Sequence, residues 1–430
     1  MLPEGWEIRS LAFFVSSLDA GVSVNSEDRP YRLGEVGVLK TSAVTGSYFN
    51  SEEHKAVLQR ERHRVRTSPE ADSIIVSRMN TPELVGESAY VDKDYPELFL
   101  PDRLWLLRFW DRNSLSVKWL SYVLCSERVR AYIQLNSTGT SGSMKNLPKE
   151  RFLKMRIVCP PLFEQRQIVE TLDTVDEAIT HTSSLIAKLK QMKAGLLHDL
   201  LTRGLDENGE LRDAIAHPEQ FKDSPLGQIP REWETGVLGD VVDPNRPIVY
   251  GILMPGYGYP GGIPVVKVKD IINSKIQTSD LLLTSPEIDN NYRRSRLEPG
   301  DLLFTIRGTV GRMAFVPEHL RGANITQDTA RLAITNANPR FVRQYLEMPK
   351  PQAFIELHTI GQAVKGINLR DVRLIPLVVP PTSEQLQIID ICDTYDSRIH
   401  TEEAYRDKLK LQKQGLMHDL LTGKVRLKDA

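Results

Sequence analysis

The feature that most constrains this chain is an internal repeat. Residues 160–202 read PPLFEQRQIVETLDTVDEAITHTSSLIAKLKQMKAGLLHDLLT, and residues 380–422 read PPTSEQLQIIDICDTYDSRIHTEEAYRDKLKLQKQGLMHDLLT. About 21 of these 43 positions are identical without a gap, which chance does not produce. The similarity extends to AYIQLNSTG and AFIELHTIG upstream, and to PEGWE and PREWE at the start of each half. The chain therefore holds two tandem copies of one design, with a period too long for a solenoid.

The repeated segment has the periodicity of a long helix. Apolar residues follow a 4-3-4 spacing in both copies, which begin with Ile168, Leu172, Val175 and Ile179 and with Ile388, Cys392, Tyr395 and Ile399. Glu164 and Glu384 fall in the first turn, where carboxylates suit the helix dipole. Gly204 and Gly423 follow the last apolar residue as stop signals. Each helix is expected to have about 38 residues, hence a length of about 57 Å.

Each predicted helix has one apolar stripe and needs a partner, and the nearest match is the other copy. We expect the two helices to pack as an antiparallel coiled coil, with a globular block at either end and a pseudo-two-fold axis between the copies. Two unrelated helical hairpins are the alternative. Gly195 and Gly415 recur inside the helices, where Gly costs about 1 kcal/mol relative to Ala. Their recurrence indicates close backbone approach at a crossing; a tolerated flaw inherited by both copies is the alternative.

The rest of the chain forms two globular blocks, called here the first head (residues 1–158) and the second head (residues 221–378). Both read as α+β, with short β-rich runs between Gly and Pro turns. The runs are EVGVLKTSAV, DSIIVSR and DRLWLLRF in the first head and IPVVKVKDI, DLLFTIR and ARLAI in the second. The Asp-to-Arg spacing of DSIIVSR matches that of DLLFTIR, so one framework carries different loops, as expected if each copy reads a different ligand. Between and after the heads we place a helix over 159–204, a linker over 205–220, a helix over 379–424 and a tail over 425–430.

The net charge is only −1, from 55 Lys and Arg against 56 Asp and Glu, but the basic residues are clustered. HKAVLQRERHRVR in the first head carries five Lys or Arg, and NYRRSR in the second carries three Arg beside a Tyr. Such clusters suit contact with phosphate, and Arg also suits guanine edges. A solvated helix face is the alternative for any one cluster. Their recurrence on the same scaffold favours nucleic acid.

Sequence motifs for catalysis or cofactor binding are mostly absent. GYGYPG at residues 256–261 matches the dinucleotide-binding pattern, but it leads into a strand, so it offers no helix N-terminus for phosphate. The sequence has no Walker A motif, no Asn-Pro-Pro-aromatic tetrapeptide and no nuclease-type PD…(D/E)xK constellation. His198 and His418 recur beside Asp in the helices and are expected to be structural. We therefore expect a recogniser without catalysis of its own.

Composition excludes several other classes. Cys125, Cys159 and Cys392 form no CxxC pair, which argues against a disulfide scaffold and against a structural zinc site. No apolar run approaches the roughly 18 residues that span a bilayer, and no basic region followed by an apolar core marks a signal peptide. We expect a cytoplasmic protein with no membrane partner.

The tandem design resembles the specificity (S) subunit of type I restriction–modification systems over nearly the whole chain. The resemblance is carried by PPLFEQRQI and PPTSEQLQI, by GLLHDLLT and GLMHDLLT, by RLEPGDLLFTIRGTVGR and by IPREW. The first head departs from the pattern after Arg78, where MNTPELVG replaces the turn from Gly308 to Gly311. The resemblance implies that each head is a target recognition domain for one half of a bipartite DNA site. It implies that the helices fix the unread spacer and dock two methyltransferase subunits, which restriction subunits can join.

The resemblance also implies that catalysis belongs to the partners. S-adenosylmethionine, ATP and Mg are expected there, and this chain is expected to bind no cofactor or metal. DNA-contacting residues, mostly clamping phosphates, are expected to be Lys40, Thr41, Lys55, Arg60, Arg62, Arg64, Arg66, Arg78, Lys267, Lys269, Arg293, Arg294, Arg296, Arg307 and Thr309. The alternative is a protein-assembly scaffold whose heads bind proteins, with the basic loops as ordinary surface.

Overall fold

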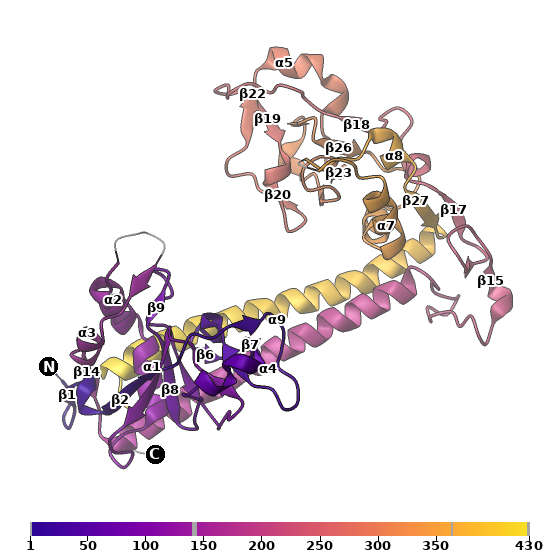
Figure 1. Cartoon of the computed structure of the whole chain (residues 1–430). Helices are drawn as coiled ribbons and strands as arrows, with labels where there is room; N and C mark the ends of the chain where they lie inside the picture. Colours follow the sequence, from indigo (N-terminus) through magenta and orange to yellow (C-terminus); the bar gives the residue numbers. More distant parts are fainter. Residues whose placement is uncertain (1, 140–143, 363, 428–430) are drawn as a thin grey trace. The chain divides into compact units, whose positions relative to one another are not determined.

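The computed structural model describes residues 2–139, 144–362 and 364–427. Its contacts define two compact units: unit 1 comprises Met1–Ser184 and Glu403–Ala430, and unit 2 comprises Leu185–Glu402. The long helices α4 (Leu162–Leu200) and α9 (Thr382–Thr422) each contribute one part to either unit (Figure 1). Each unit therefore holds one head and a part of both long helices.

The two long helices confirm the prediction from the repeat, and within each unit they run antiparallel. In unit 1 the start of α4 shares a core with the end of α9, through Leu172 and Leu420. In unit 2 the end of α4 shares a core with the start of α9, through Leu200 and Ile388. Gly204 and Gly423 follow the helices with φ of 65° and 72°, as expected of C-terminal stops.

The helical glycines do not mark a crossing. A Cβ added to Gly195 or Gly415 would have no atom within 4 Å. The expectation of a close backbone approach at these positions is therefore wrong, because both glycines face open space.

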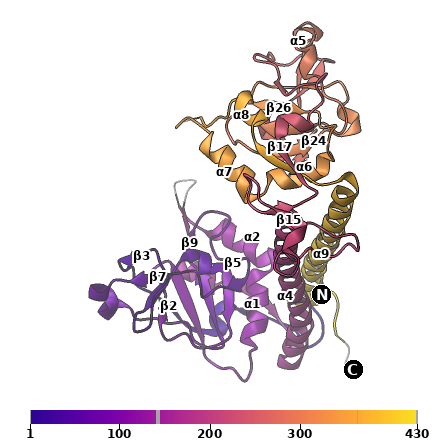
Figure 2. The same cartoon turned by 90° about the vertical axis from the view of Figure 1, so that its right-hand side faces the viewer.

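The first head is built on a sheet that is buried on both faces. Its strand order is β10-β8-β12-β2, with bounds Ser88–Val91, Ser73–Ser77, Leu104–Phe109 and Val15–Ala20. Ile74 of β8 faces a core that includes α1 (Val117–Cys125), α2 (Glu127–Asn136) and the long helices. Figure 2 shows α1 and α2 beside α4. The next residue, Ile75, faces a second core. That second core lies against another sheet of order β11-β4-β7-β3, with bounds Leu98–Phe99, Gly37–Leu39, His54–Val57 and Ser26–Glu27.

The second head repeats this arrangement. Its main sheet has the order β18-β26-β23-β24, with bounds Val249–Tyr250, Thr329–Leu332, Leu302–Thr305 and Met313–Phe315. Phe304 faces the core shared with α6 (Pro339–Leu346), α7 (Pro349–Leu357) and the long helices, whereas Leu303 faces the core beneath the second sheet. That second sheet has the order β22-β19-β25, with bounds Leu282–Thr284, Ile263–Val266 and Asn324–Ile325. The remaining helices of the heads are α3 (Lys149–Leu153), α5 (Pro286–Asn291) and α8 (Leu369–Arg373).

Equivalent small elements occur at equivalent places in the two heads. The hairpin of β5 (Val44–Thr45) and β6 (Tyr48–Phe49) corresponds to that of β20 (Ile271–Ile272) and β21 (Lys275–Ile276). Both turns place two residues at positive φ, as a two-residue type I′ turn requires. Each head is also closed by a strand pair, β1 (Glu7–Ser10) with β14 (Arg156–Cys159) and β17 (Glu234–Val237) with β27 (Pro376–Val379). The predicted shared framework is therefore confirmed, although the second sheet has four strands in the first head and three in the second.

A buried carboxylate marks the start of each long helix. Trp6 Nε1 donates to Glu164 at 3.0 Å, and Trp233 Nε1 donates to Glu384 at 3.0 Å. Each glutamate also pairs with an arginine that follows the end of the other long helix. Glu164 of α4 pairs with Arg426, which follows α9, and Glu384 of α9 pairs with Arg212, which follows α4. The first-turn glutamates thus do more than suit the helix dipole, because they join the head, the helix start and the chain that follows a helix end.

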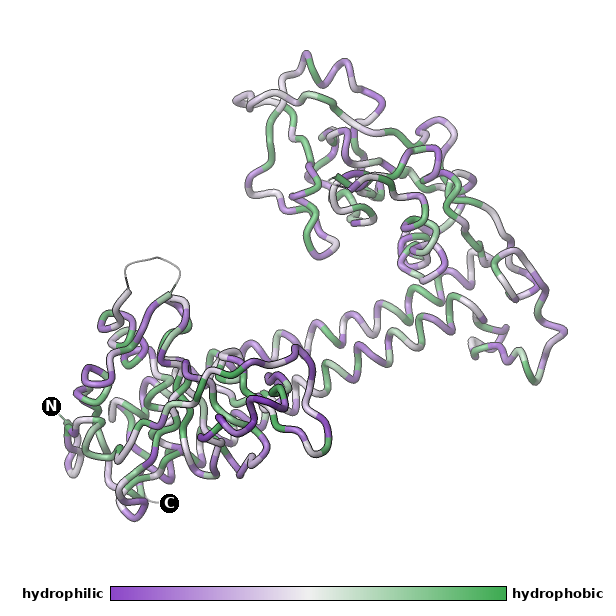
Figure 3. Tube along the Cα trace, viewed as in Figure 1, coloured by the Kyte–Doolittle hydropathy of each residue, from purple (hydrophilic) through white to green (hydrophobic). Residues whose placement is uncertain are grey.

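Hydrophobic and hydrophilic residues alternate along both long helices (Figure 3). Within the described ranges, no helix is long and apolar enough to cross a membrane.

Candidate nucleic-acid interface

The lysines predicted in the first head gather around one carboxylate. Lys40 follows β4 and precedes the turn that begins at Thr41, and Lys55 lies in the neighbouring strand β7. Their Nζ atoms lie 3.4 and 3.5 Å from Asp28 Oδ1. The hydrogen bond and charge of Lys40, followed by those of Lys55, lower the pKa of Asp28. Both lysines remain partly exposed, so their charge is shared between this carboxylate and the solvent.

Some arginines of the first basic cluster are bound to partners within the chain, and others are not. They follow β7 in the short 3-10 turn Gln59–Arg64 and just beyond it. Arg64 pairs with Glu61, and Arg62 donates to the Gly34 carbonyl at 2.9 Å. Arg60 and Arg66 are exposed, and in the part of the chain that the structure describes neither forms an ion pair or a side-chain hydrogen bond. These two are the members of the cluster most available to an external phosphate.

Arg78 and Arg307 occupy equivalent positions at the ends of the central strands β8 and β23, as the matching spacing predicts. The Arg78 guanidinium lies over the Trp105 ring, 5.7 Å from its centroid, and its Nε is buried without a hydrogen-bond partner in the described structure. Arg307 is exposed, as is Thr309 in the following turn. The two heads thus present the same residue differently, and the departure noted after Arg78 begins at this point.

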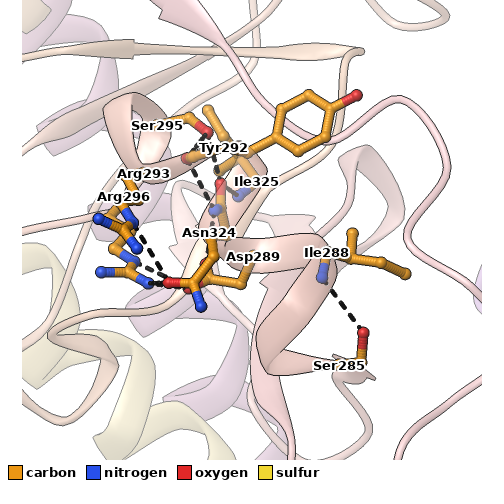
Figure 4. A network of polar contacts seen from close by, with 10 residues as sticks. Ser285, Ile288, Asp289, Tyr292, Arg293, Ser295, Arg296, Asn324 and Ile325 are labelled. Carbon is orange, nitrogen blue, oxygen red and sulfur yellow. Dashed lines mark hydrogen bonds and ion pairs between the residues drawn. The ribbon is translucent and has the colours of Figure 1, made fainter.

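A buried polar network supports the second basic cluster (Figure 4). Asp289 of α5 is only 1% exposed. It accepts from Arg296 Nε at 2.8 Å and from Asn324 Nδ2 at 2.8 Å. Ser295 in turn donates its hydroxyl to Asn324 Oδ1 at 2.7 Å. Arg296, predicted to contact DNA, is thus held by an internal carboxylate and anchors the loop instead of presenting its full charge outward.

Arg293 and Arg294 lie on the short turn Arg293–Ser295 that this network fixes. Both are exposed. Arg293 donates only to the neutral Asn290 side chain, at 3.3 Å, and Arg294 has no ion pair or side-chain hydrogen bond among the described residues. A rigid base therefore carries two arginines whose charge no acidic side chain offsets.

Lys267 and Lys269 lie at the end of β19, the strand equivalent to β4 of the first head. Asp270 is buried and accepts from the Lys267 backbone N–H at 2.9 Å. This contact turns the chain away from the strand, so the run IPVVKVKDI is a strand only as far as Val266. Lys269 is exposed and Lys267 is partly so.

The sequence did not predict a cavity of about 630 Å³ in the second head. Arg307 is one of its walls, and the other walls come from segments near residues 250, 327 and 360–369. These segments are distant in sequence, and only the strand pairing brings them together. The apolar pair Leu253 and Met254 in the Gly- and Pro-rich loop after β18 is the sequence signal that could have indicated it.

The three cysteines lie in buried or partly buried surroundings. All three cysteines are free, and burial raises the pKa of Cys159 and of Cys392 to about 11. Burial also raises the pKa of Cys125. Within residues 2–139, 144–362 and 364–427, no group of three or more His, Cys, Asp or Glu side chains could hold a metal ion.

Comparison with known proteins agrees with this arrangement. The family model described as "Type I restriction modification DNA specificity domain" matches residues 3–191 and 230–411. The EcoBI type I restriction enzyme specificity subunit of Escherichia coli is 28% identical over 284 residues, which span 65% of this chain and 58% of that subunit. The putative MjaX specificity subunit of Methanocaldococcus jannaschii is 25% identical over 439 residues, or 99% of this chain and 95% of that subunit.

A chain from a solved structure concerned with complex assembly and conformational transition of the type I R-M system has a similar fold. It covers 99% of this chain and 100% of its own length, with a TM-score of 0.58 and 19% sequence identity. The similarity supports the fold described above.

Proposed function

Because this chain belongs to the family of type I restriction modification DNA specificity domains, we propose that it is the sequence-specific DNA-recognition subunit of a type I restriction–modification complex. Each head reads one half of a bipartite double-stranded site. The observation that carries this proposal is the shared framework: the main sheet has the same strand order in both heads, with different basic loops at equivalent places. Two different readers on one scaffold suit two different half-sites.

The long helices set the unread spacer and dock two methyltransferase subunits, which restriction subunits join. Their length supports the first role, because helices of 39 and 41 residues extend about 1.5 Å per residue. Exposed apolar side chains support the second. Phe163 and Met192 of α4, and Leu386 and Leu411 of α9, are exposed to solvent in this chain and are suited to burial against a partner.

Catalysis belongs to the partner subunits in this proposal. Methyl transfer requires S-adenosylmethionine, and restriction requires ATP and Mg; this chain supplies DNA recognition and assembly. The burial of the cysteines supports this division of labour, because it raises the pKa of all three thiols and so disfavours the nucleophilic thiolate. We place the complex in the cytoplasm, where cellular DNA is its partner.

Charge reversal of Arg293 and Arg294 tests the proposal. The double variant Arg293→Glu and Arg294→Glu is expected to weaken DNA binding by the methyltransferase complex at least about 100-fold, because two phosphate contacts become repulsive. The slope of log affinity against log salt should fall by about 2. Binding is measured by gel shift over a salt series, and thermal unfolding and methyltransferase docking should match those of the wild type.

The matched control is Arg321→Glu, which reverses an exposed arginine of the same head that is already paired with Glu318. It should bind DNA nearly as well as the wild type. Unchanged affinity of the double variant at low salt would contradict the assigned interface.

Protection mapping separates the proposal from a protein-assembly scaffold. Two protected patches with an indifferent gap support DNA recognition. No protection on any DNA would favour heads that bind proteins.

A further inference from the structure

The cavity in the second head has an unusual rim. Four apolar side chains around it are strongly exposed: Tyr250 and Leu253 at 50% each, Ile360 at 65% and Val364 at 66%. Singly exposed apolar residues are ordinary, but several around one hollow mark a binding surface. The rim therefore indicates a partner with an apolar group.

The polar side chains that line the cavity suit a partner with hydrogen-bond acceptors or negative charge. Arg307 at the end of β23 and Gln327 before β26 both line it, and no Asp or Glu is among its described lining residues. Lys365 is exposed beside the rim. The described lining residues therefore carry a positive charge from Arg307, which suits DNA and disfavours an acidic protein surface.

The walls are fixed by backbone hydrogen bonds between segments distant in sequence. Gly308 N–H donates to the Lys365 carbonyl at 2.9 Å, and Ile367 N–H donates to the Ile306 carbonyl at 2.9 Å. On the other side, Gln327 N–H donates to the Ile252 carbonyl at 3.0 Å. These hydrogen bonds tie the segments around Ile252 and Lys365 to the segments that carry Gln327 and Arg307. The cavity is therefore preformed.

We infer that this cavity reads an A·T base pair in the major groove of the half-site that the second head recognises. The thymine C5-methyl group packs against the apolar rim, and the Gln327 amide faces the adenine N6 and N7 edge. Arg307 holds the adjacent backbone phosphate. This inference rests on the proposed function and adds to it the side chains that set one position of the target sequence.

Deoxyuridine substitution tests the methyl contact, because uracil pairs like thymine but lacks the methyl group. The wild-type complex is first used to map its bipartite site by methylation sequencing. Each thymine of the second half-site is then replaced in turn by deoxyuridine in a synthetic duplex. At one position the affinity should fall about fourfold, the value expected for one buried methyl group.

The variants Val364→Ala and Leu253→Ala should remove this discrimination. Each should bind the thymine and uracil duplexes equally, at about the affinity of the wild type for uracil. Gln327→Ala should relax the requirement for adenine at the same base pair. Leu374→Ala is the matched control, because Leu374 is 45% exposed in the same head and does not line the cavity.

Three outcomes would overturn the inference: a second half-site without thymine, no position sensitive to deoxyuridine, or full discrimination retained by both rim variants. Circular dichroism identifies a variant that fails to fold, and the other rim variant then decides. Failure of the proposed function is recognised separately, because the wild-type complex would then give no methylated bipartite site to map.

Discussion

At the residue scale, the buried glutamates Glu164 and Glu384 occupy equivalent positions, but their ion pairs with arginine differ in exposure to solvent. Arg212 leaves only 9% of its side chain exposed beside Glu384, which also accepts from the Leu205 N–H at 2.7 Å. Arg426 beside Glu164 is 42% exposed. The pair in unit 2 is therefore shielded from water, whereas the pair in unit 1 is partly screened by it.

We predict that Glu384→Gln destabilises unit 2 by about 3 kcal/mol, because the substitution removes the buried partner of Arg212 and leaves it only the exposed Glu232 carboxylate, 3.7 Å away. Glu164→Gln should cost clearly less, since solvent reaches Arg426. Urea unfolding followed by tryptophan fluorescence measures both, with Trp233 as the reporter in unit 2 and the four tryptophans of unit 1 as reporters there. Equal losses in the two variants would show that burial of the arginine does not decide the cost.

The sequence could identify the basic loops but not the contacts that their side chains make, and DNA contact by these loops stays a prediction. Basic clusters identified the loops that carry Arg60, Arg293 and Arg294, because charge patterns are local in sequence. The sequence could not show that Arg296 is held by Asp289, which requires α5 to bring a buried carboxylate under the loop. Nor could it show the cavity walls, since Tyr250, Arg307 and Val364 meet only after the strands have paired.

At the element scale, the long helices were predictable because two copies gave the same periodicity and the same stop signals. The strands were harder to predict. Runs such as DSIIVSR and DLLFTIR became β8 and β23, but β18 and β25 have only two residues each and carry too little pattern to identify. Such strands exist because neighbouring strands supply their hydrogen bonds, which local sequence does not encode.

The helical glycines give a prediction opposite to the one their recurrence first indicated. Gly195→Ala and Gly415→Ala should each stabilise the protein by about 1 kcal/mol, because alanine favours the helix and a Cβ meets no atom within 4 Å. Thermal and urea unfolding would detect the gain. Gly204→Ala is the control: its φ is 65°, and its Cβ would overlap the Glu384 carboxylate, so it should destabilise. A loss of stability in the first two variants would restore the idea of a close approach.

At the scale of the whole molecule, the repeat predicted two similar halves, and contacts define units that cut across them. Unit 2 is one continuous stretch, Leu185–Glu402, whereas unit 1 joins Met1–Ser184 to Glu403–Ala430. The core of unit 1 requires Leu420 and Leu421, which are 2% and 7% exposed. Antiparallel pairing of the long helices is the reason, since it brings the end of α9 to the start of α4.

A chain truncated after Glu402 should therefore keep a protease-resistant unit 2 and lose the resistance of the first head. Limited proteolysis with mass spectrometry of the fragments measures this. Resistance of both heads in the truncated chain would show that α9 is dispensable to unit 1.

The same connectivity sets an order of events on the ribosome. The first head emerges first, yet Leu420 and Leu421 of α9, which complete its core, are translated only after all of unit 2 has been made. Unit 2 can reach its final packing before the end of α9 has been made and can pack on the first head. The core of the first head is thus completed last, and the surface that α9 covers stays open to chaperones until synthesis ends.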